Sequence, residues 1–495
     1  MTNANFFTTL ARAYKPAIDK PFLTIPNGRT ISYGEIDVLS AKIASALLAA
    51  GAAPGERIAV QVEKSPENVA LYLGAMRAGL IYVPLNSAYT AEEIAYFLHD
   101  ASPAIFICDP HREEALFPAA QAADVKSLLT LGADGDGSLM NSLKHIKPRE
   151  EICIRGSDDI AVILYTSGTT GRSKGAMLTH NNLQSNALAL NSLWGFSGDD
   201  ILLHALPVFH IHGLFVALHT AMLSACEIIF LPKFDIEEIV TCLSRATVMM
   251  GVPTFYARLL EYEKFTKALC AHMRLFISGS APLTKETFNA FEARTGHTIL
   301  ERYGMSEAGM IASNPLDGPR IAGTVGHALP EVSIRISGPA PGEIEIRGPN
   351  LFAGYWENPE STSKAFTEDG WFRTGDMGVI DDDGRLSLVG REKDLIISGG
   401  FNIYPVEIEQ TLDSSPGVLE SAVIGVPHAD MGEGVVAVIV ETDGGVTDEC
   451  LTHAVESLAK FKRPRKFFRL NALPRNAMGK VQKQRLREQY KNAYQ

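Results

Sequence analysis

The stretch YTSGTTGRSKGAMLTH, residues 165–180, follows the apolar run IAVILY and combines glycines and hydroxyl side chains with Lys174. Glycine lets the backbone approach an anion closely, and backbone N–H and hydroxyl groups can donate to it, so this composition favours a phosphate-binding loop. The Walker loop is excluded, because it has glycine before its lysine and Ser or Thr after it. Here Ser173 precedes Lys174 and Gly175 follows it. The stretch therefore predicts a phosphate loop of another kind, placed directly after a buried strand.

On both sides of this loop, short apolar runs alternate with segments of helical periodicity. IAVQV (58–62), AIFIC (104–108), IAVILY (160–165) and LFISG (275–279) are typical of buried strands, whereas 181–194 has an apolar helical face. This order predicts an α/β fold, with a large N-terminal domain built on two parallel-type sheets covered by helices.

The pattern of apolar residues changes in the last third of the sequence. From about residue 326 the apolar residues alternate strictly, as in VSIRIS (332–337) and GEIEIRG (342–348), which predicts a small antiparallel or β-barrel-like subdomain. VIGVPH and VVAVIV, followed by a basic C-terminal stretch, predict a small α/β domain at the end of the chain.

Composition limits the class of protein. With 495 residues, 46% of them hydrophobic, the chain can bury large cores, and its net charge of -12 argues against a nucleic-acid partner. The six cysteines form no C-x-x-C pair, which favours free thiols in a reducing compartment and hence the cytoplasm. A membrane span is not expected, because no long apolar run is present, and a secretory signal is not expected, because the start MTNANFFTTLARAY lacks a charged segment followed by an apolar core; a weak organellar presequence stays open.

Five motifs in order resemble those of the adenylate-forming superfamily of acyl-CoA synthetases, nonribosomal adenylation domains and luciferases. They are YTSGTTGRSKGAMLTH (165–180), ERYGMSE (301–307), GWFRTGD (370–376), GREKDLIISGGFNIYPVEIE (390–409) and PRNAMGKVQK (474–483). The resemblance covers the whole chain. It implies that a carboxylate attacks the α-phosphorus of ATP to give an acyl-adenylate and pyrophosphate, after which a thiol displaces AMP.

The resemblance also implies where the nucleotide binds. The segment from Thr166 to Lys174 would hold the β- and γ-phosphates, Glu307 would hold Mg²⁺, and Tyr303 would stack on adenine. A carboxylate is a suitable oxygen ligand for that ion. The further nucleotide contacts implied by the motifs are Ser167, Gly168, Thr169, Thr170, Gly171, Gly279, Ser280, Ala281, Glu301, Arg302, Gly304, Met305 and Ser306.

In the last part of the chain, the resemblance assigns Asp376 and Arg391 to the ribose. Lys480 would bridge the substrate carboxylate and the α-phosphate in the first half-reaction only. Members of this superfamily rotate their C-terminal domain between the two steps, which predicts a hinge at Asp394 and domains at 1–393 and 394–495. After that rotation, Ser398, Gly399 and Gly400 would contact coenzyme A.

The acyl pocket is expected to include Arg302. An unpaired guanidinium facing a fatty or aromatic acyl group would be costly, whereas the second carboxylate of a short diacid such as malonate would pair with it. The alternative is that Arg302 pairs with Glu301 or another acid nearby. Arg258 and Arg274 are other candidate anion partners, and the remaining pocket residues would be His210, Ile211, Leu214, Ser278 and Met310.

Longer segments in and around the motifs, such as LPVFHIHGLF, HMRLFISGSAPL and LERYGMSEAGM, are most similar to those of malonyl-CoA synthetases. The expected substrates are therefore malonate, ATP and coenzyme A. A synthetase for methylmalonate or another short-chain acid, and a stand-alone adenylation enzyme that loads a carrier protein, stay open as alternatives. A nucleotide sensor without catalysis is disfavoured, because Lys480 and Glu307 are both present.

Overall fold

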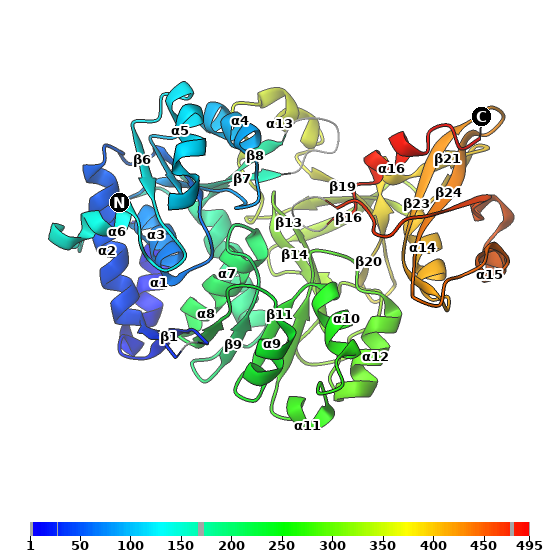
Figure 1. Cartoon of the computed structure of the whole chain (residues 1–495), viewed down its shortest axis with the longest axis horizontal. Coiled ribbons are helices and arrows are strands. Elements are labelled where there is room, and N and C mark those ends of the chain that lie inside the picture. Colours follow the sequence, from blue (N-terminus) through cyan, green and yellow to red (C-terminus); the bar gives the residue numbers. More distant parts are fainter. Residues whose placement is uncertain (1–2, 27, 167–172, 476–479, 495) are drawn as a thin grey trace. The chain divides into compact units, whose positions relative to one another are not determined.

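The computed structural model describes residues 3–26, 28–166, 173–475 and 480–494, which pack into two compact units (Figure 1). The first comprises Met1–Ser333 and Arg347–Phe372, and the second Ile334–Ile346 and Arg373–Gln495. The division at residues 393 and 394 concerns a movement between reaction steps and stays a prediction.

A nine-stranded sheet forms one half of the first unit. Its centre from β1 to β13 is parallel, and antiparallel strands border it on both sides. In sheet order the strands are β15 (His327–Ala328), β14 (Gly309–Ser313), β13 (Leu300–Met305), β12 (Leu275–Ser278), β11 (Val248–Gly251), β9 (Ile201–His204), β10 (Glu227–Phe230), β1 (Pro21–Thr24) and β2 (Thr30–Ser32).

A seven-stranded sheet forms the other half, with the predicted phosphate loop between its strands β7 and β8. In sheet order it contains β18 (Gly354–Tyr355), β8 (Lys174–Thr179), β7 (Ile160–Thr166), β4 (Ile81–Pro84), β3 (Arg57–Gln61), β5 (Ile105–Cys108) and β6 (Ser127–Thr130). The four strands expected from the apolar runs are confirmed as β3, β5, β7 and β12.

Helices cover both sheets because their apolar faces need a partner. On the seven-stranded sheet, α4 (Ala91–Ala101) and α5 (Glu113–Ala122) lie side by side and share a buried cluster with β3, β4 and β5 (Figure 1). On the nine-stranded sheet, α9 (Ile236–Leu243), α10 (Pro253–Glu261) and α12 (Lys285–Thr295) bury one face around Phe276 and Phe291. The predicted helix at 181–194 is α7 (His180–Leu193), which begins with a capping box at Thr179.

The remaining helices of the first unit include a π-helix, η4 (His212–Ala217), which continues into α8 (Leu218–Ser224). The other α-helices are α1 (Phe6–Tyr14), α2 (Tyr33–Ala49), α3 (Pro66–Arg77), α6 (Ser138–Ser142), α11 (Lys267–Cys270) and α13 (Pro359–Ala365), and the short 3-10 helices are η1 (Lys15–Ala17), η2 (Pro110–Arg112) and η3 (Leu143–His145).

The second unit contains two smaller sheets. The predicted antiparallel or barrel-like subdomain is a sheet of four strands, in the order β16 (Ser333–Ser337), β17 (Gly342–Arg347), β19 (Phe372–Ile380) and β20 (Leu386–Arg391). The predicted small α/β domain is a five-stranded sheet of β22 (Phe401–Ile403), β21 (Ile396–Ser398), β24 (Gly432–Glu441), β23 (Val418–His428) and β25 (Lys466–Arg469). Its helices are α14 (Pro405–Asp413), α15 (Asp448–Ala454) and α16 (Lys483–Gln489).

The five-stranded sheet is apolar on both faces. Alternate residues of β24 enter two different cores, with Val435, Ala437 and Ile439 on one side and Val436 and Val438 on the other. This period of two explains why the runs VIGVPH and VVAVIV are continuously apolar instead of alternating.

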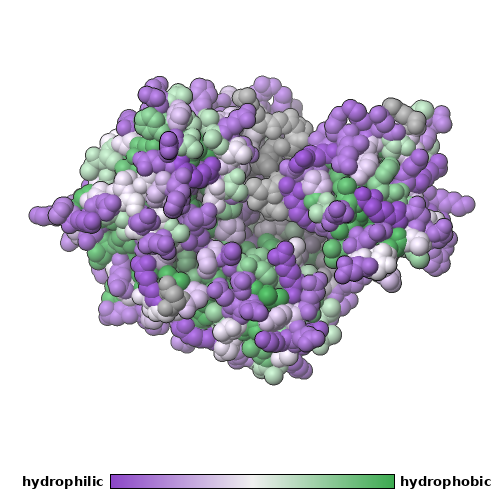
Figure 2. Space-filling view, in the orientation of Figure 1, coloured by the Kyte–Doolittle hydropathy of each residue, from purple (hydrophilic) through white to green (hydrophobic). Residues whose placement is uncertain are grey.

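The surface agrees with the composition. Hydrophilic residues cover most of the visible face of each unit, and apolar residues are scattered among them (Figure 2). Among the helices that the structure describes, none has the length and apolar character that crossing a bilayer requires. All six cysteines are free thiols, as the sequence predicted.

Candidate active site

The predicted phosphate loop closes a hairpin between β7 and β8. Thr166, the last residue of β7, lies opposite Lys174, the first residue of β8. The hydroxyl of Tyr96 on α4 donates a hydrogen bond of 2.6 Å to the carbonyl of Ser173 and so fixes the end of the loop. The hairpin therefore places Lys174 at the base of the loop. The predicted contacts Ser167, Gly168, Thr169, Thr170 and Gly171 lie outside the described residues.

Glu307, the predicted metal ligand, follows β13 and is buried, with 7% of its surface exposed. The hydroxyl of Tyr355 donates a hydrogen bond of 3.1 Å to its Oε1, and the Phe352 N–H donates one of 2.8 Å to its carbonyl. In the part of the chain that is described, no cluster of three or more His, Cys, Asp or Glu could hold a metal by itself. A single buried carboxylate fits Mg²⁺, which commonly takes its other ligands from substrate phosphates and water.

The predicted adenine site lies at the carboxyl end of β12, where Ser278 pairs with Glu301 and β13 continues to Met305. Gly279, Ser280 and Ala281 follow β12, and Tyr303 in β13 is buried, with 6% of its surface exposed. Ser280 has a φ of 73°, in the left-handed region that residues other than glycine seldom adopt. Because parallel sheets bind ligands beyond the carboxyl ends of their strands, this position suits the nucleotide.

Glu301 and Arg302 lie on opposite faces of β13. The register pairs Glu301 with Ser278, so these two side chains share a face, and Glu301 Oε1 accepts a hydrogen bond from the Leu283 N–H (3.3 Å). Burial raises the pKa of Glu301 to about 8. The alternative ion pair between Glu301 and Arg302 is not formed. Ser278, predicted to line the acyl pocket with Arg302, has its side chain on the other face of the sheet.

Arg302 is buried, and part of its guanidinium lacks a partner within the described part of the chain. Only 3% of its surface is exposed, and neither Nε nor Nη2 has a hydrogen-bond partner among the described residues. Burial lowers the pKa of this guanidinium to about 9. Gly279 makes room for it, because a Cβ at that position would lie 2.5 Å from the Arg302 Cζ. A buried guanidinium without a partner is costly, and a carboxylate would satisfy it with two hydrogen bonds.

His212 lies near this guanidinium and was not predicted. It begins η4, is 1% exposed, and has an Nδ1 3.3 Å from the Ser280 Oγ and an Nε2 without a partner in the described structure. Burial first, and then the charge of Arg302, lower its pKa well below the usual value, so the ring is neutral. The sequence signal that could have indicated His212 is its place in HIHGLF, two residues after the predicted pocket residue His210.

The residues predicted from LPVFHIHGLF to line the acyl pocket lie at the start of η4, and their role in binding the acid stays a prediction. Ile211 and Leu214 are buried, and the Leu214 N–H donates to the His210 carbonyl (2.9 Å) at the start of η4. A second histidine supports this segment from β9, because His204 Nε2 lies 2.9 Å from the Gly213 carbonyl. Met310, in β14, is fully buried.

The two other arginines proposed for the acyl pocket are placed differently. Arg274 forms a bidentate ion pair with Asp200, with bonds of 2.7 and 2.8 Å, and is already satisfied there. Arg258 is exposed on α10, with its guanidinium 5.6 Å from the centre of the Phe234 ring. Their surroundings argue against a role in binding a buried carboxylate and leave Arg302 as the candidate.

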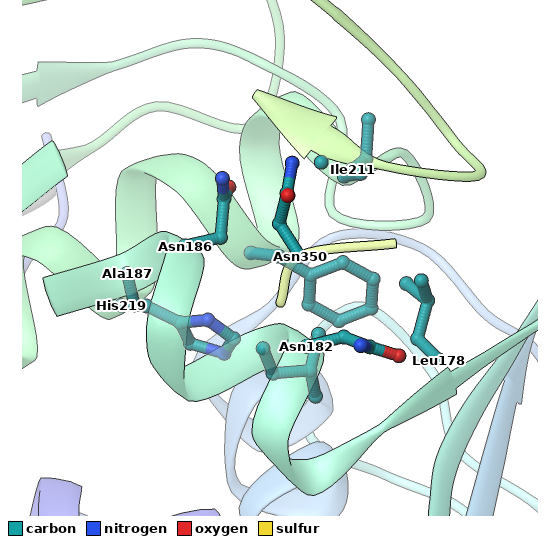
Figure 3. A pocket seen from close by; sticks show the side chains of 10 residues that line it. Leu178, Asn182, Asn186, Ala187, Ile211, His219 and Asn350 are labelled. Atoms are coloured by element: carbon teal, nitrogen blue, oxygen red, sulfur yellow. The ribbon is translucent and has the colours of Figure 1, made fainter. Parts of the chain in front are cut away.

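Ile211 also lines a small cavity, together with residues from β8, α7, η4, α8, β14 and the loop before β18. Its volume of about 10 Å³ suits one water and not an acyl group. Asn186 and Asn350 lie side by side there, both donating to the Met310 carbonyl, with Ile211 and His219 nearby (Figure 3). The cavity is therefore too small to be the acyl pocket.

In the second unit, the two predicted ribose contacts are paired with each other. Asp376 in β19 lies opposite Arg391 in β20, and Arg391 Nε is 2.8 Å from Asp376 Oδ1. The Asp376 side chain is 8% exposed, so this is a partly buried ion pair in which Arg391 orients the carboxylate.

The predicted hinge and coenzyme A loop belong to this same unit. Asp394 accepts a hydrogen bond of 2.8 Å from Arg487 on α16. Ser398 ends β21, and Gly399 and Gly400 form the turn to β22 with φ values of 57° and 79°, which glycine adopts without strain. Lys480 is exposed.

An aromatic pair beside this turn was not predicted. Phe401, which follows Gly400, stacks on Phe461 with ring centres 4.4 Å apart, and 52% of its surface is exposed. Two phenylalanines stacked at the surface offer a flat apolar face to a ligand. Neither periodicity nor the motifs bring residues 401 and 461 together, so only the fold could reveal the pair.

Comparison with known proteins places this arrangement in a family. The AMP-binding enzyme family matches residues 10–356, and the AMP-binding enzyme C-terminal domain matches residues 407–480. A malonate–CoA ligase of Arabidopsis thaliana is 34% identical over 94% of this chain and 86% of its own. A mitochondrial malonate–CoA ligase of Mus musculus is also 34% identical, over 88% of this chain and 82% of its own.

Solved structures agree. ATP-bound MatB from Rhodopseudomonas palustris is 50% identical to this chain and superposes with a TM-score of 0.96, and the match covers 100% of both chains. A benzoate CoA ligase from Burkholderia xenovorans is 27% identical with a TM-score of 0.88, covering 98% of this chain and 100% of its own. The fold is thus common to ligases of different acids.

Proposed function

The chain belongs to the AMP-binding enzyme family, and we propose that it joins malonate to coenzyme A, forming malonyl-CoA through a malonyl-AMP intermediate. ATP is consumed and AMP and pyrophosphate are released, so the enzyme is an AMP-forming acid–thiol ligase. The malonate–CoA ligases among its relatives support this proposal.

One observation carries the choice of acid: the Arg302 guanidinium is buried, and its Nε and Nη2 have no hydrogen-bond partner among the residues that the structure describes. An apolar acyl group would leave this cation unsatisfied, and a carboxylate next to the reacting one would pair with it in a bidentate geometry. Gly279 lies beside the guanidinium, and the nearby His212, whose pKa is lowered by burial and by Arg302, is neutral and adds no second positive charge there. A short dicarboxylate provides the matching negative charge.

In the first half-reaction, one malonate oxygen attacks the α-phosphorus of ATP while the bond to the β-phosphate breaks and pyrophosphate leaves. Lys174 and the loop that it closes hold the β- and γ-phosphates, Asp376 binds the ribose hydroxyls, and Lys480 bridges the attacking carboxylate and the α-phosphate. Mg²⁺, when bound, neutralises phosphate charge, and Glu307 is the carboxylate that holds it. Positioning and charge stabilisation are what such a phosphoryl centre requires.

In the second half-reaction, the coenzyme A sulfur attacks the malonyl carbonyl carbon and AMP leaves with the bonding electrons. Ser398, Gly399 and Gly400 line the path of the pantetheine arm, and Asp394 is the hinge about which they move. The stacked Phe401 and Phe461 beside them offer a surface for the adenine of coenzyme A, whose face stacks well on aromatic rings.

The test is AMP formation by the purified protein with ATP, Mg²⁺ and coenzyme A, across acetate, propionate, malonate, methylmalonate, succinate and benzoate. The expected result is the highest kcat/KM with malonate and a much lower value with acetate and propionate. A preference for methylmalonate, or for a monocarboxylate, would replace malonate as the substrate. Acyl-adenylate formation without transfer to coenzyme A would favour a carrier protein as the acceptor.

The cytoplasm is the proposed location. The free cysteines support this location, because thiols that form no disulfide are typical of proteins in a reducing compartment.

A further inference from the structure

Tyr355 contacts two of the groups that the first half-reaction needs. Its hydroxyl donates a hydrogen bond of 3.1 Å to Oε1 of Glu307, the carboxylate expected to hold the metal. The Nζ of Lys174, at the base of the phosphate loop, lies 5.1 Å from the centre of the Tyr355 ring. This distance is within the range of a cation–π interaction. One side chain thus joins the metal carboxylate and the loop lysine.

The backbone fixes Tyr355 in this position. The short strand β18 pairs with β8, with Tyr355 opposite Ala176 and the Trp356 N–H donating to the Gly175 carbonyl (2.7 Å). On the other side, the Phe352 N–H donates to the Glu307 carbonyl (2.8 Å). The segment that carries Tyr355 is therefore hydrogen-bonded both to the strand that begins with Lys174 and to Glu307 itself.

A hydrogen-bond partner of a metal-binding carboxylate fixes which way the carboxylate points, and its removal typically weakens metal binding by 10- to 100-fold. A ring beside a lysine holds the ammonium without neutralising it, so its charge stays available for an anion. A carboxylate in the same place as the ring would cancel part of that charge.

We propose that Tyr355 is a positioning residue of the adenylation step, which orients Glu307 toward the metal–nucleotide through its hydroxyl and holds Lys174 toward the phosphates through its ring. This inference rests on the proposed ATP chemistry and does not depend on which acid is activated.

The test separates the two contacts with two variants. Tyr355→Phe removes the hydroxyl and keeps the ring, whereas Tyr355→Leu removes both. The matched control is Tyr14→Phe, which breaks the same kind of hydrogen bond, here to Asp37 (2.7 Å), between α1 and α2. ATP binding is measured by calorimetry over a range of Mg²⁺ concentrations with no acid present, so that no turnover occurs.

For Tyr355→Phe, the Mg²⁺ concentration that gives half-maximal ATP binding should rise about tenfold, with affinity restored at saturating Mg²⁺. Tyr355→Leu should in addition bind ATP several-fold more weakly even at saturating Mg²⁺, because Lys174 has lost its support. Transfer of the malonyl group from supplied malonyl-AMP to coenzyme A should stay near wild type in Tyr355→Phe. Tyr14→Phe should resemble wild type in all three measurements.

Two results would overturn the proposal. One is an unchanged Mg²⁺ dependence of ATP binding in Tyr355→Phe. The other is equal loss in both half-reactions together with a lower melting temperature, which would make Tyr355 a structural residue. If malonate proves not to be the substrate, the calorimetric result still decides the role of Tyr355, since it contains no acid.

Discussion

Replacing Arg302 with Met should change which acids the enzyme accepts. Methionine has a similar reach and leaves an apolar wall in place of the guanidinium. Two nitrogens of Arg302, Nε and Nη2, are buried without partners in the described structure and would each donate to the distal carboxylate of malonate. The substitution removes both hydrogen bonds and the positive charge at once.

The magnitude follows from the burial. A hydrogen bond to a charged group contributes roughly 1.5–3 kcal/mol, so losing this bidentate pair should cost malonate on the order of 3 kcal/mol, or about 10² in kcat/KM. Propionate carries no distal charge and should lose little, or gain, because it no longer faces an unpaired cation. The ratio of malonate to propionate kcat/KM should therefore fall by about two orders of magnitude.

The assay is initial-rate AMP release with each acid, together with the dissociation constant of ATP. The matched control is Arg258→Met, the same change at an exposed arginine on α10, which should leave the ratio unaltered. Gly279→Ala gives an independent check, because its Cβ would lie 2.5 Å from the Arg302 Cζ and should shift the guanidinium and lower malonate activity. Full malonate activity in Arg302→Met, or an equal loss for every acid along with weaker ATP binding, would refute the reasoning.

Three further predictions test other parts of the molecule. Lys480→Ala should nearly abolish malonate-dependent pyrophosphate release but spare coenzyme A attack on supplied malonyl-AMP, and equal loss of both would contradict domain alternation. Phe461→Ser should raise the KM for coenzyme A about tenfold and leave pyrophosphate release unchanged, and a normal KM would exclude the stacking role. Burial lowers the pKa of His180 to about 4, so its contribution to the free energy of unfolding is present above pH 6.5 and lost as the pH falls toward 4. In His180→Asn, the amide oxygen can still accept the hydrogen bond from the Phe6 N–H. Denaturant titrations between pH 6.5 and 4 should show that the free energy of unfolding of this variant falls by about 3 kcal/mol less than that of the wild type. The same pH dependence of the free energy of unfolding in both proteins would contradict this prediction.

The fold could be predicted because its signals are local. Runs such as IAVQV at 58–62 and LFISG at 275–279 are apolar without interruption, and in the structure they are β3 and β12 in the parallel parts of two sheets. The order of strands could not be predicted in the same way. β9 lies between β10 and β11, and the short strand β18 joins β8 across a long sequence separation, because contacts between distant segments decide these positions.

The residues of the candidate site also fall into those that a local motif could identify and those that depend on contacts between distant segments. Residues inside a motif, such as Arg302 and Glu307, could be named from the sequence, and the structure shows that both are buried. The sequence alone could not show on which face of the sheet a side chain lies, because this depends on the register between β12 and β13. That register places Ser278 on the same face as Glu301 and on the opposite face from Arg302. Tyr355 was missed because its role depends on β18 reaching β8, and nothing local in GYWENPE signals that contact.

The state of His212 explains why the pocket would be selective for one negative charge. Burial and the charge of Arg302 lower the pKa of this ring well below its usual value, so near neutral pH it adds no positive charge beside the guanidinium. A protonated His212 would give the site two cations and leave one of them unpaired when malonate is bound. With the ring neutral, the guanidinium of Arg302 would balance the distal carboxylate of malonate in the proposed pocket, and the other carboxylate would be free to react. A monocarboxylate in the proposed pocket would leave the buried cation without a partner, and this cost would fall on every step in which the wrong acid occupies the site.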